Sequence, residues 1–391
     1  MKEIKISPFY CLAIFYLVVN FVYAMVGYKT GVMEIEFQRK VIDSISFIYA
    51  FAFQFLSMSL IILVYLLNSK KLKSYDDFVL SNKVGWFLFF GQLFYFLLNM
   101  YFGANIAGDT SSYKGNAFIN IFFILLPFDI LFFILGICLK SSRLFFLNSV
   151  LYLISNLVRG WMGVPLLLLF AILCRQEYIK LKVKNIIIMF FGLLSILLSS
   201  PYLMELKWLV RGKLEDVSII DNVSSYGYLN YLSESIDYIF NRFQHVGHVA
   251  LILDNREYLN LKYSNDFFVN FWAEGLPQTI FMNFFSIDSF TTFSRFVTVH
   301  LFNVSPSQSW TVNVGMAGWF LILDYNVFFY LLYLFLILFF PFYFVAKYAN
   351  RKLFLVLSIF SIFYLFHGWF YAYFTLVMYM IIIIFLSKVK L

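Results

Sequence analysis

Long apolar runs separated by short polar segments dominate the chain and predict helices that cross a membrane. A helix needs about 20 mainly apolar residues to span ~30 Å of hydrocarbon. Six runs have the length of a single span, and they lie at residues 8–28, 42–67, 84–103, 117–139, 185–204 and 325–346. We therefore expect one transmembrane helix from each of these six runs.

Two further apolar blocks, 144–174 and 353–386, are too long for one span and short for two. Basic residues flank both ends of each block, and basic residues favour the cytoplasmic side. Each block is therefore predicted to cross twice, as a hairpin whose tip is RGW at 159–161 or HGW at 367–369. In each tip, glycine permits a tight turn and tryptophan suits a membrane interface. The arms have only ~15 residues, or ~22 Å, so we expect the tips to lie below the outer surface.

The distribution of positive charge supports ten spans with both termini in the cytoplasm. Of the 29 Lys and Arg residues, 17 then lie on the cytoplasmic side, 5 in short outer loops and 7 in one long outer loop. The chain is thereby divided into an N-terminal bundle of seven spans (1–204), a large periplasmic loop (205–312) and a C-terminal bundle of three spans (313–391). The expected fold class is an all-α polytopic membrane protein with helices in the large loop.

Composition agrees with this fold class. Hydrophobic residues make up 62% of the chain and charged residues 13%, a balance that excludes a soluble domain. The net charge of +8 does not indicate nucleic-acid binding, because most basic residues flank apolar spans. The three cysteines lie within or at the ends of apolar segments, so we expect buried small hydrophobes rather than disulfides or zinc ligands.

The long outer loop carries most of the polar residues that suit chemistry. Its segment 233–255 has helical periodicity and predicts one continuous helix. On such a helix Arg242 lies on the flank of the apolar face, His245 further round, and His248 nearly opposite the apolar centre. Either histidine is a candidate general base because imidazole titrates near neutral pH. A metal site is disfavoured because a third ligand is not evident.

A second part of this loop, 265–288, is rich in aromatic residues. It predicts an interfacial helix or a re-entrant stretch. Later in the loop, Arg295 and His300 form another pair of basic and histidine side chains. Arg211 stands sixteen residues before Gly227. Some polymerases have the same arginine-to-glycine spacing, but a single match of this kind is close to chance. We retain Arg295, His300 and Arg211 as candidate substrate-binding residues.

Arg159 places a full positive charge in the middle of the apolar block 144–174. Such a charge costs at least ~2.5 kcal/mol at bilayer depth. One interpretation is a snorkelling arginine that contacts lipid phosphate at a helix end. The other is an anion site that faces a polar cavity, since arginine suits bidentate phosphate contacts and stays charged.

Three outer or intramembrane segments hold further candidates. Asp109, in the loop AGDTSSYKGN at 107–116, is either a catalytic carboxylate or sugar-hydroxyl acceptor, or a helix N-cap. Tyr113 of the same loop is a candidate substrate-binding residue. Glu34 and Glu36 are more typical of a solvated turn. An intramembrane carboxylate such as Asp129 is a functional candidate by default, although a structural pair explains it equally well.

Motifs for other chemistries are missing from the sequence. It contains no Walker A loop, no Asp-x-Asp motif and no His-Glu-x-x-His motif. We therefore expect neither a cofactor nor a catalytic metal.

The GDTSSY loop, the SNLVRGW hairpin, the ten expected spans and the long outer loop with an Arg/His helix together resemble Wzy-type O-antigen or capsule repeat-unit polymerases. The resemblance is architectural, covers most of the chain and extends to the related O-antigen ligases. It implies a multi-pass protein of the bacterial inner membrane that transfers a growing glycan from undecaprenyl diphosphate to the sugar of a new lipid-linked repeat unit. It also implies that Arg159 and Arg242, and less directly Arg295, lie near the lipid diphosphate. Related ligases have a key histidine late in the loop, where this chain has His300.

The same resemblance implies the partners: the undecaprenyl-diphosphate-linked oligosaccharide, the lipid bilayer and a regulator of chain length. Because the diphosphate is an activated leaving group, guanidinium groups can balance its charge without a metal, and a histidine or Asp109 can take the acceptor proton. Three alternatives remain open. One is a ligase with another acceptor, and the second is a polysaccharide flippase or transporter. The third is a transferase that uses a lipid monophosphate sugar, in which Glu34, Glu36 and Asp109 would be central.

Overall fold

The structure is a computed structural model that describes residues 5–35, 38–72, 78–107, 113–180, 182–210, 218–275, 277–278, 280–281, 291–305 and 311–388. Seven helices in this part of the chain are long and apolar enough to cross a membrane. They cover Pro8–Thr30, Ser44–Ser69, Asn82–Phe102, Phe118–Cys138, Ile187–Val210, Asp324–Tyr348 and Phe370–Ser387. The structure therefore supports an all-α membrane protein, while the ten spans and the periplasmic position of the loop stay predictions.

The chain folds into two compact units that each combine segments distant in sequence. Unit 1 comprises Met1–Pro8 and Asp76–Phe240, and unit 2 comprises Phe9–Tyr75 and Asn241–Leu391. The predicted boundaries at 204 and 312 concern membrane crossing rather than packing, and they stay a prediction.

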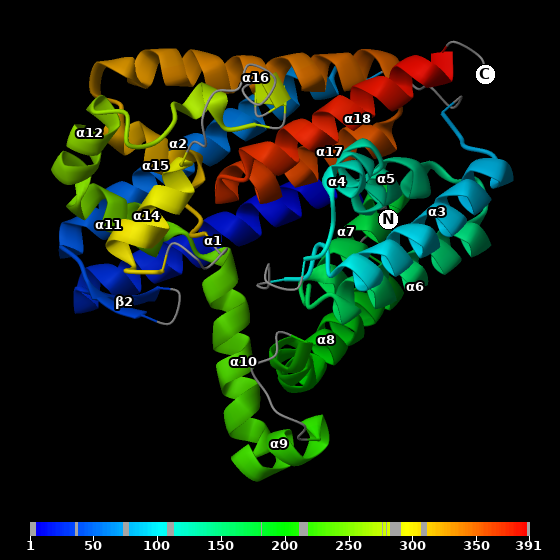
Figure 1. Ribbon diagram of the computed structural model, residues 1–391, viewed down its shortest axis with the longest axis horizontal. Coiled ribbons are helices and arrows are strands. Elements are labelled where there is room, and N and C mark those ends of the chain that lie inside the picture. The colour runs from blue at the N-terminus through cyan, green and yellow to red at the C-terminus, as the bar shows by residue number, and fades with distance from the viewer. Residues whose placement is uncertain are drawn as a thin grey trace. The chain divides into compact units, whose positions relative to one another are not determined.

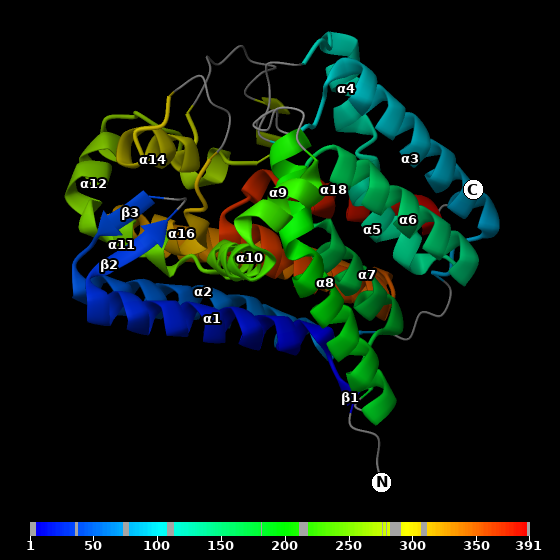
Figure 2. The same ribbon diagram turned by 90° about the horizontal axis from the view of Figure 1, so that it is seen from below.

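Unit 1 is built mainly from helices. Its elements are β1 (Lys5–Ile6), α3 (Asn82–Phe102), α4 (Ala117–Leu125), α5 (Phe128–Leu135), a 3₁₀ turn (Gly136–Cys138), α6 (Ser142–Val158), α7 (Val164–Gln176), β4 (Ile179–Lys180), α8 (Val183–Val210), α9 (Ile219–Tyr226) and most of α10 (Tyr228–Phe243). The short strands β1 and β4 pair antiparallel. Helices α3 and α6 pack side by side, as Figures 1 and 2 show.

Helix α3 has its polar side chains inside and its apolar side chains outside. Its exposed face carries large apolar residues at helical spacing, namely Phe87, Phe90, Phe94 and Leu97. On the buried face, the Gln92 amide donates to Asn148 Oδ1 of α6 at 3.3 Å. Such an arrangement suits lipid as the surrounding solvent, because polar side chains then hydrogen-bond between helices.

The predicted single helix over 117–139 is interrupted in the structure. Helix α4 ends at Leu125, and α5 starts at Phe128. Pro127 explains the break, because proline has no backbone N–H and disfavours helical geometry in the residue before it. The interruption places Asp129 in the first turn of α5.

Unit 2 combines the first long apolar helices of the chain with its C-terminal helices. Its elements are α1 (Pro8–Thr30), β2 (Val32–Ile35), β3 (Gln38–Val41), α2 (Ser44–Ser69), α11 (Val246–Asp254), α12 (Arg256–Ser264), a 3₁₀ turn (Phe271–Ala273), α14 (Phe293–Leu301), α15 (Gly315–Ile322), a 3₁₀ turn (Asp324–Asn326), α16 (Val327–Tyr348), α17 (Arg351–Ser361), a π-helical turn (Ile362–Phe366) and α18 (Phe370–Lys388). Helix α2 packs against both α11 and α16 (Figure 1). Figure 2 shows the antiparallel hairpin of β2 and β3.

Both predicted hairpin tips interrupt their helices where expected. Gly160 and Gly368 adopt φ values of +81° and +85°, a left-handed conformation that favours glycine. The N–H groups of Trp161 and Trp369 reach back to the carbonyls of Asn156 and Tyr364. With the bonds from Gly160 to Leu157 and from Gly368 to Leu365, each tip forms a Schellman motif that ends its helix.

The predicted continuous helix over 233–255 is wrong. Helix α10 ends at Phe243, and α11 begins at Val246. The break changes the direction of every side chain that follows it, so the expected angles of His245 and His248 around one helix do not apply. Both histidines are buried, with 1% and 4% of their surface exposed.

The aromatic segment predicted over 265–288 is only partly described, because residues 276, 279 and 282–290 lie outside the described part. Where it is described, its regular structure up to residue 275 is limited to the 3₁₀ turn at Phe271–Ala273. Residues 277, 278, 280 and 281 are helical. A helix that starts at 265 is therefore not formed, while an interfacial helix after residue 275 and a re-entrant stretch both stay predictions.

Candidate functional site

The predicted site residues fall into two polar centres, one in each unit. We name the first the arginine centre, formed by Arg159, Asp129, Asn156, Tyr95, Asn99, Asn105 and Trp161 of unit 1. We name the second the histidine centre, formed by Tyr16, Asn20, Arg242, His245, His248 and His367 of unit 2.

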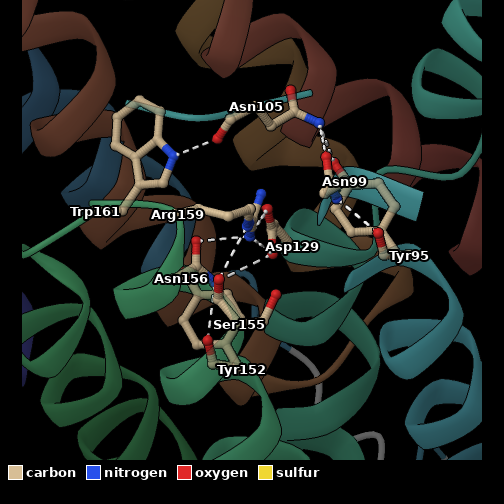
Figure 3. Close-up of polar contacts among 9 residues, drawn as sticks. All are labelled: Tyr95, Asn99, Asn105, Asp129, Tyr152, Ser155, Asn156, Arg159 and Trp161. Atoms are coloured by element: carbon tan, nitrogen blue, oxygen red, sulfur yellow. Dashed lines mark hydrogen bonds and ion pairs between the residues drawn. The ribbon is translucent and has the colours of Figure 1, made fainter. Parts of the chain in front are cut away.

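Arg159 caps the end of α6 and is almost fully buried, with 1% of its surface exposed. Its Nη2 forms an ion pair with Asp129 at 2.8 Å and also donates to Asn156 Oδ1 at 2.9 Å. Its Nε donates to the carbonyl of Ser155 at 3.1 Å. Figure 3 shows the guanidinium group between Asp129 and Asn156, with the ring of Tyr95 5.7 Å from its Cζ atom.

A loop that follows α3 closes over the tip of this hairpin. The Ala107 N–H donates to the Arg159 carbonyl at 2.8 Å. The Trp161 indole donates to the Asn105 carbonyl at 2.9 Å, as Figure 3 shows by a dashed line. Asn105 itself has φ +53° and donates to Asn99 Oδ1 at 2.6 Å. The tip is therefore fixed by α3 and its following loop as well as by its own two helices.

These contacts change the interpretation of Arg159. A snorkelling arginine is wrong, because the guanidinium lies inside unit 1 and is paired with a carboxylate. The expected anion site is also not open, since Asp129 already balances the positive charge of Arg159. The Asp129 side chain remains 31% exposed, so an anionic ligand would have to compete with this carboxylate for the guanidinium.

The histidine centre brings together three of the four histidines in the chain. The rings of His245 and His367 have centroids 4.0 Å apart, and those of His245 and His248 are 6.0 Å apart. The Tyr16 hydroxyl lies 2.8 Å from Nε2 of His367. Arg242 is exposed in the last turn of α10, and its charge acts on His245 and His367.

Asn20 of α1 fixes the backbone at the break between α10 and α11. Its Oδ1 accepts hydrogen bonds from the N–H groups of His245 at 2.7 Å and Val246 at 3.2 Å. Its Nδ2 donates to the Phe243 carbonyl at 3.1 Å. A single buried amide therefore satisfies backbone groups on both sides of the break and sets the direction of His245.

Burial and positive neighbours keep His245 neutral. Burial lowers the pKa of His245 well below its usual value, and the nearby His367, His248 and Arg242 lower it further. Neither ring nitrogen of His245 has a hydrogen-bond partner among the described residues. At neutral pH this imidazole therefore has a lone pair that no described residue engages, which a general base requires, while its lowered pKa makes it a weaker proton acceptor than an exposed histidine.

The other predicted residues are distributed over both units. The Tyr113 hydroxyl donates to Asn120 Oδ1, which engages it in an internal contact of unit 1. Arg295 is half-buried on α14 of unit 2, and His300 on the same helix is exposed beside the ring of Phe296. Five positions separate Arg295 from His300, so the two side chains leave α14 roughly 140° apart.

Three candidates, Asp109, Arg211 and Glu36, lie outside the described residues. Glu34 is exposed on β2, opposite Arg39 of β3. Groups of three or more His, Cys, Asp or Glu side chains arranged for a metal ion do not occur in the described part of the chain.

Sequence reasoning missed Tyr16, Asn20 and His367 as members of a site. His367 was treated only as part of a hairpin tip. The available signals were a polar Asn20 within an apolar span, and a tip in which a histidine occupies the position that arginine has in RGW. The expectation that an intramembrane Asp129 has a structural partner fits the ion pair with Arg159.

Comparisons with known proteins add no assignment: no protein-family model, curated protein or solved structure matches this chain.

Proposed function

We propose that the protein polymerises lipid-linked oligosaccharide repeat units at the periplasmic face of the bacterial inner membrane. It would transfer the growing glycan from undecaprenyl diphosphate to a sugar hydroxyl of a new repeat unit. The observation that carries this proposal is the histidine centre, in which a buried His245, whose ring nitrogens have no partner among the described residues, lies close to His367 and His248 and within reach of the charge of Arg242.

This centre suits transfer from an anionic leaving group. In the reaction, the bond from the anomeric carbon to the diphosphate oxygen breaks, and the acceptor oxygen forms the new bond to that carbon. His245 takes the proton from the acceptor hydroxyl, while undecaprenyl diphosphate leaves with the bonding electrons. The positive charge of Arg242 favours the charge that develops on the diphosphate.

Arg159 has a different part in this proposal. Because Asp129 neutralises it, we propose that Arg159 contributes to substrate binding only when a diphosphate displaces that carboxylate. A bidentate contact of guanidinium with phosphate is strong enough to compete with one carboxylate.

The test is the glycan pattern of a deletion strain complemented with variants. Without the gene, we expect single repeat units but no long chains on a gel, and the wild-type gene should restore the ladder. Arg242→Ala and His245→Gln should each leave single repeats. Arg256→Ala, which removes an exposed arginine paired with Asp324, is the matched control and should keep the ladder.

Other outcomes identify the alternatives. Complete loss of surface glycan in the deletion strain would favour a ligase or a flippase over a polymerase. Normal chain length in Arg242→Ala and His245→Gln would remove the histidine centre from the site. A transferase that uses a lipid monophosphate sugar predicts different variants to be inactive. In that case Glu34→Ala should lose activity, and Arg159→Ala should keep it.

A further inference from the structure

Helix α1 supplies two polar side chains to the histidine centre from one face. Tyr16 and Asn20 are four residues apart, a spacing that stacks side chains on the same side of a helix. Tyr16 contacts His367, and Asn20 holds the backbone of His245. Both side chains are fully buried. Helix α1 therefore contacts the ring of His367 and the backbone of His245, whose imidazoles pack closely together.

The contact of Tyr16 with His367 is compatible with either neutral tautomer of that ring. A tyrosine hydroxyl is both a donor and an acceptor, whereas a neutral imidazole has one donor and one acceptor nitrogen. When the hydroxyl donates to Nε2, the ring proton is held on Nδ1. Nδ1 of His367 is buried, and no described residue accepts a hydrogen bond from it.

The two imidazoles thus differ in what they offer. His245 has both ring nitrogens unpartnered among the described residues, and its ring centroid lies 4.0 Å from that of His367. In the Nδ1–H tautomer, His367 has its lone pair engaged by Tyr16 and offers only an N–H group. The positive charge of Arg242 acts on both rings, so it favours negative charge near them.

We infer that His367, held by Tyr16 in its Nδ1–H form, is a catalytic hydrogen-bond donor to an anionic diphosphate oxygen, and that Tyr16 is its positioning residue. The inference rests on the proposed function for the identity of the reaction. As the glycosidic bond to the leaving group breaks, the electron pair moves to the diphosphate oxygen, and Nδ1–H of His367 stabilises it. The acceptor proton goes to His245, so the two histidines have separate roles.

The first experiment measures the tautomer without any assay of activity. The protein, labelled with nitrogen-15 at its histidines and held in phosphatidylcholine nanodiscs, is studied by NMR, with His367→Asn used to assign the signal. We expect His367 to be neutral with its proton on Nδ1, and Tyr16→Phe to change this signal. A proton on Nε2, or a spectrum unchanged in Tyr16→Phe, would overturn the inference.

The same sample tests the ligand. Inorganic pyrophosphate is the probe, and it should shift the Nδ1 resonance of His367 in wild-type protein and less in Arg242→Ala. Replacing part of the phosphatidylcholine with phosphatidylglycerol distinguishes a diphosphate from a lipid headgroup. A shift with phosphatidylglycerol but not with pyrophosphate would contradict a diphosphate site.

The second experiment compares two amide replacements of the imidazole. Asparagine places its amide N–H near the position of Nδ1, whereas glutamine places it near Nε2. In the complemented strain, we expect His367→Asn to extend chains about tenfold better than His367→Gln, the loss that one missing hydrogen bond to a charged group typically produces. Equal activity of the two variants would contradict the role of Nδ1.

Tyr16→Phe needs a control for ordinary loss of a buried hydrogen bond. Tyr373→Phe serves, because the buried Tyr373 hydroxyl donates to the Ile337 carbonyl at 2.8 Å. Tyr16→Phe should shorten chains and Tyr373→Phe should not, and equal shortening would assign Tyr16 a purely structural part. If wild-type protein extends no chains, the proposed function fails, while the NMR measurement still decides the tautomer.

Discussion

At the scale of single residues, two arginines that look alike in the sequence have opposite surroundings. Arg159 is buried and paired with Asp129, whereas Arg242 is exposed and acts on His245 together with two other basic groups. Desolvating a charge is costly unless a partner compensates it. The carboxylate beside Arg159 is therefore part of the fold, and the charge of Arg242 acts on the imidazole of His245.

The ion pair at Arg159 leads to an asymmetric prediction. Asp129→Ala leaves a buried, unpaired guanidinium and should destabilise the protein by about 3 kcal/mol. Arg159→Met should cost less, because Asp129 is 31% exposed and can be hydrated or protonated. Thermal unfolding in detergent measures both variants. As a control, Arg256→Ala removes one partner of an exposed ion pair and should change stability by less than about 1 kcal/mol. A larger loss of stability for Arg159→Met than for Asp129→Ala would contradict this account.

Glu274 makes the stability of the protein depend on pH. Burial raises the pKa of Glu274 from 4.5 to about 7, although its Oε1 accepts a hydrogen bond from the Phe293 N–H at 2.7 Å. The folded state therefore holds this proton more tightly than the unfolded state. Stability from this group is complete below about pH 4.5 and is lost as pH rises to about 7.

Glu274→Gln tests this effect, because glutamine keeps an acceptor for Phe293 without the charge. At pH 8 the variant should be more stable than wild type by about 3 kcal/mol, and the difference should shrink towards zero near pH 4.5. Thermal unfolding measured across this pH range gives the comparison. A constant difference between variant and wild type at all pH values would show that Glu274 does not titrate as described.

At the scale of secondary-structure elements, the same three-residue pattern ends a helix in each unit. Arg159 and His367 are the cap residues, and a left-handed glycine and a tryptophan follow each of them. Each tryptophan indole then donates to an asparagine, to the Asn105 carbonyl in one unit and to Asn313 Oδ1 in the other. This local geometry ends the helix and turns the basic side chain into its unit.

Gly368 is the position at which this turn tolerates substitution least. A Cβ there would lie 2.8 Å from the backbone nitrogen of Gly315, and φ is +85°. Gly368→Ala should therefore destabilise the protein by about 2–4 kcal/mol. Gly192→Ala on α8, where a Cβ meets no atom within 4 Å, should be neutral or slightly stabilising; similar unfolding temperatures for the two variants would contradict the close approach.

Local features of these elements could be predicted from the sequence, and distant contacts could not. The apolar runs at 8–28 and 42–67 predict helices close to the observed Pro8–Thr30 and Ser44–Ser69. The glycine and tryptophan of RGW and HGW correctly marked the breaks in the two longer apolar blocks. The break at Phe243 was missed because the apolar periodicity continues through it. Its cause, Asn20, is more than two hundred residues away in the sequence, and the contact of Tyr16 with His367 joins residues 351 positions apart.

At the scale of the whole molecule, successive segments of the chain belong alternately to the two units. Long helices in both units also expose large apolar side chains. Unit 2 packs the first two long helices against the C-terminal third of the chain, and unit 1 takes the segment between them. Helix α8 of unit 1 is mainly exposed along its apolar length, with Ile188, Phe190 and Phe191 each more than half exposed. Such surfaces require lipid, so the fold is consistent with a membrane but leaves the orientation to the distribution of charge.

The predicted orientation places Lys70 in the cytoplasm and Glu257 in the outer loop. Both residues are exposed in unit 2, so a cysteine at either position is accessible to a maleimide. Cys138 and Cys174 are buried, but Cys11 is exposed, which contradicts its expected burial and requires Cys11→Ser in the background. In intact cells stripped of the outer membrane, Glu257→Cys should react with a membrane-impermeant maleimide, and Lys70→Cys should react only after permeabilisation. Reaction of Lys70→Cys from outside would contradict the cytoplasmic end of α2. Reaction of Glu257→Cys only after permeabilisation would exclude the periplasmic histidine centre on which the proposed transfer depends.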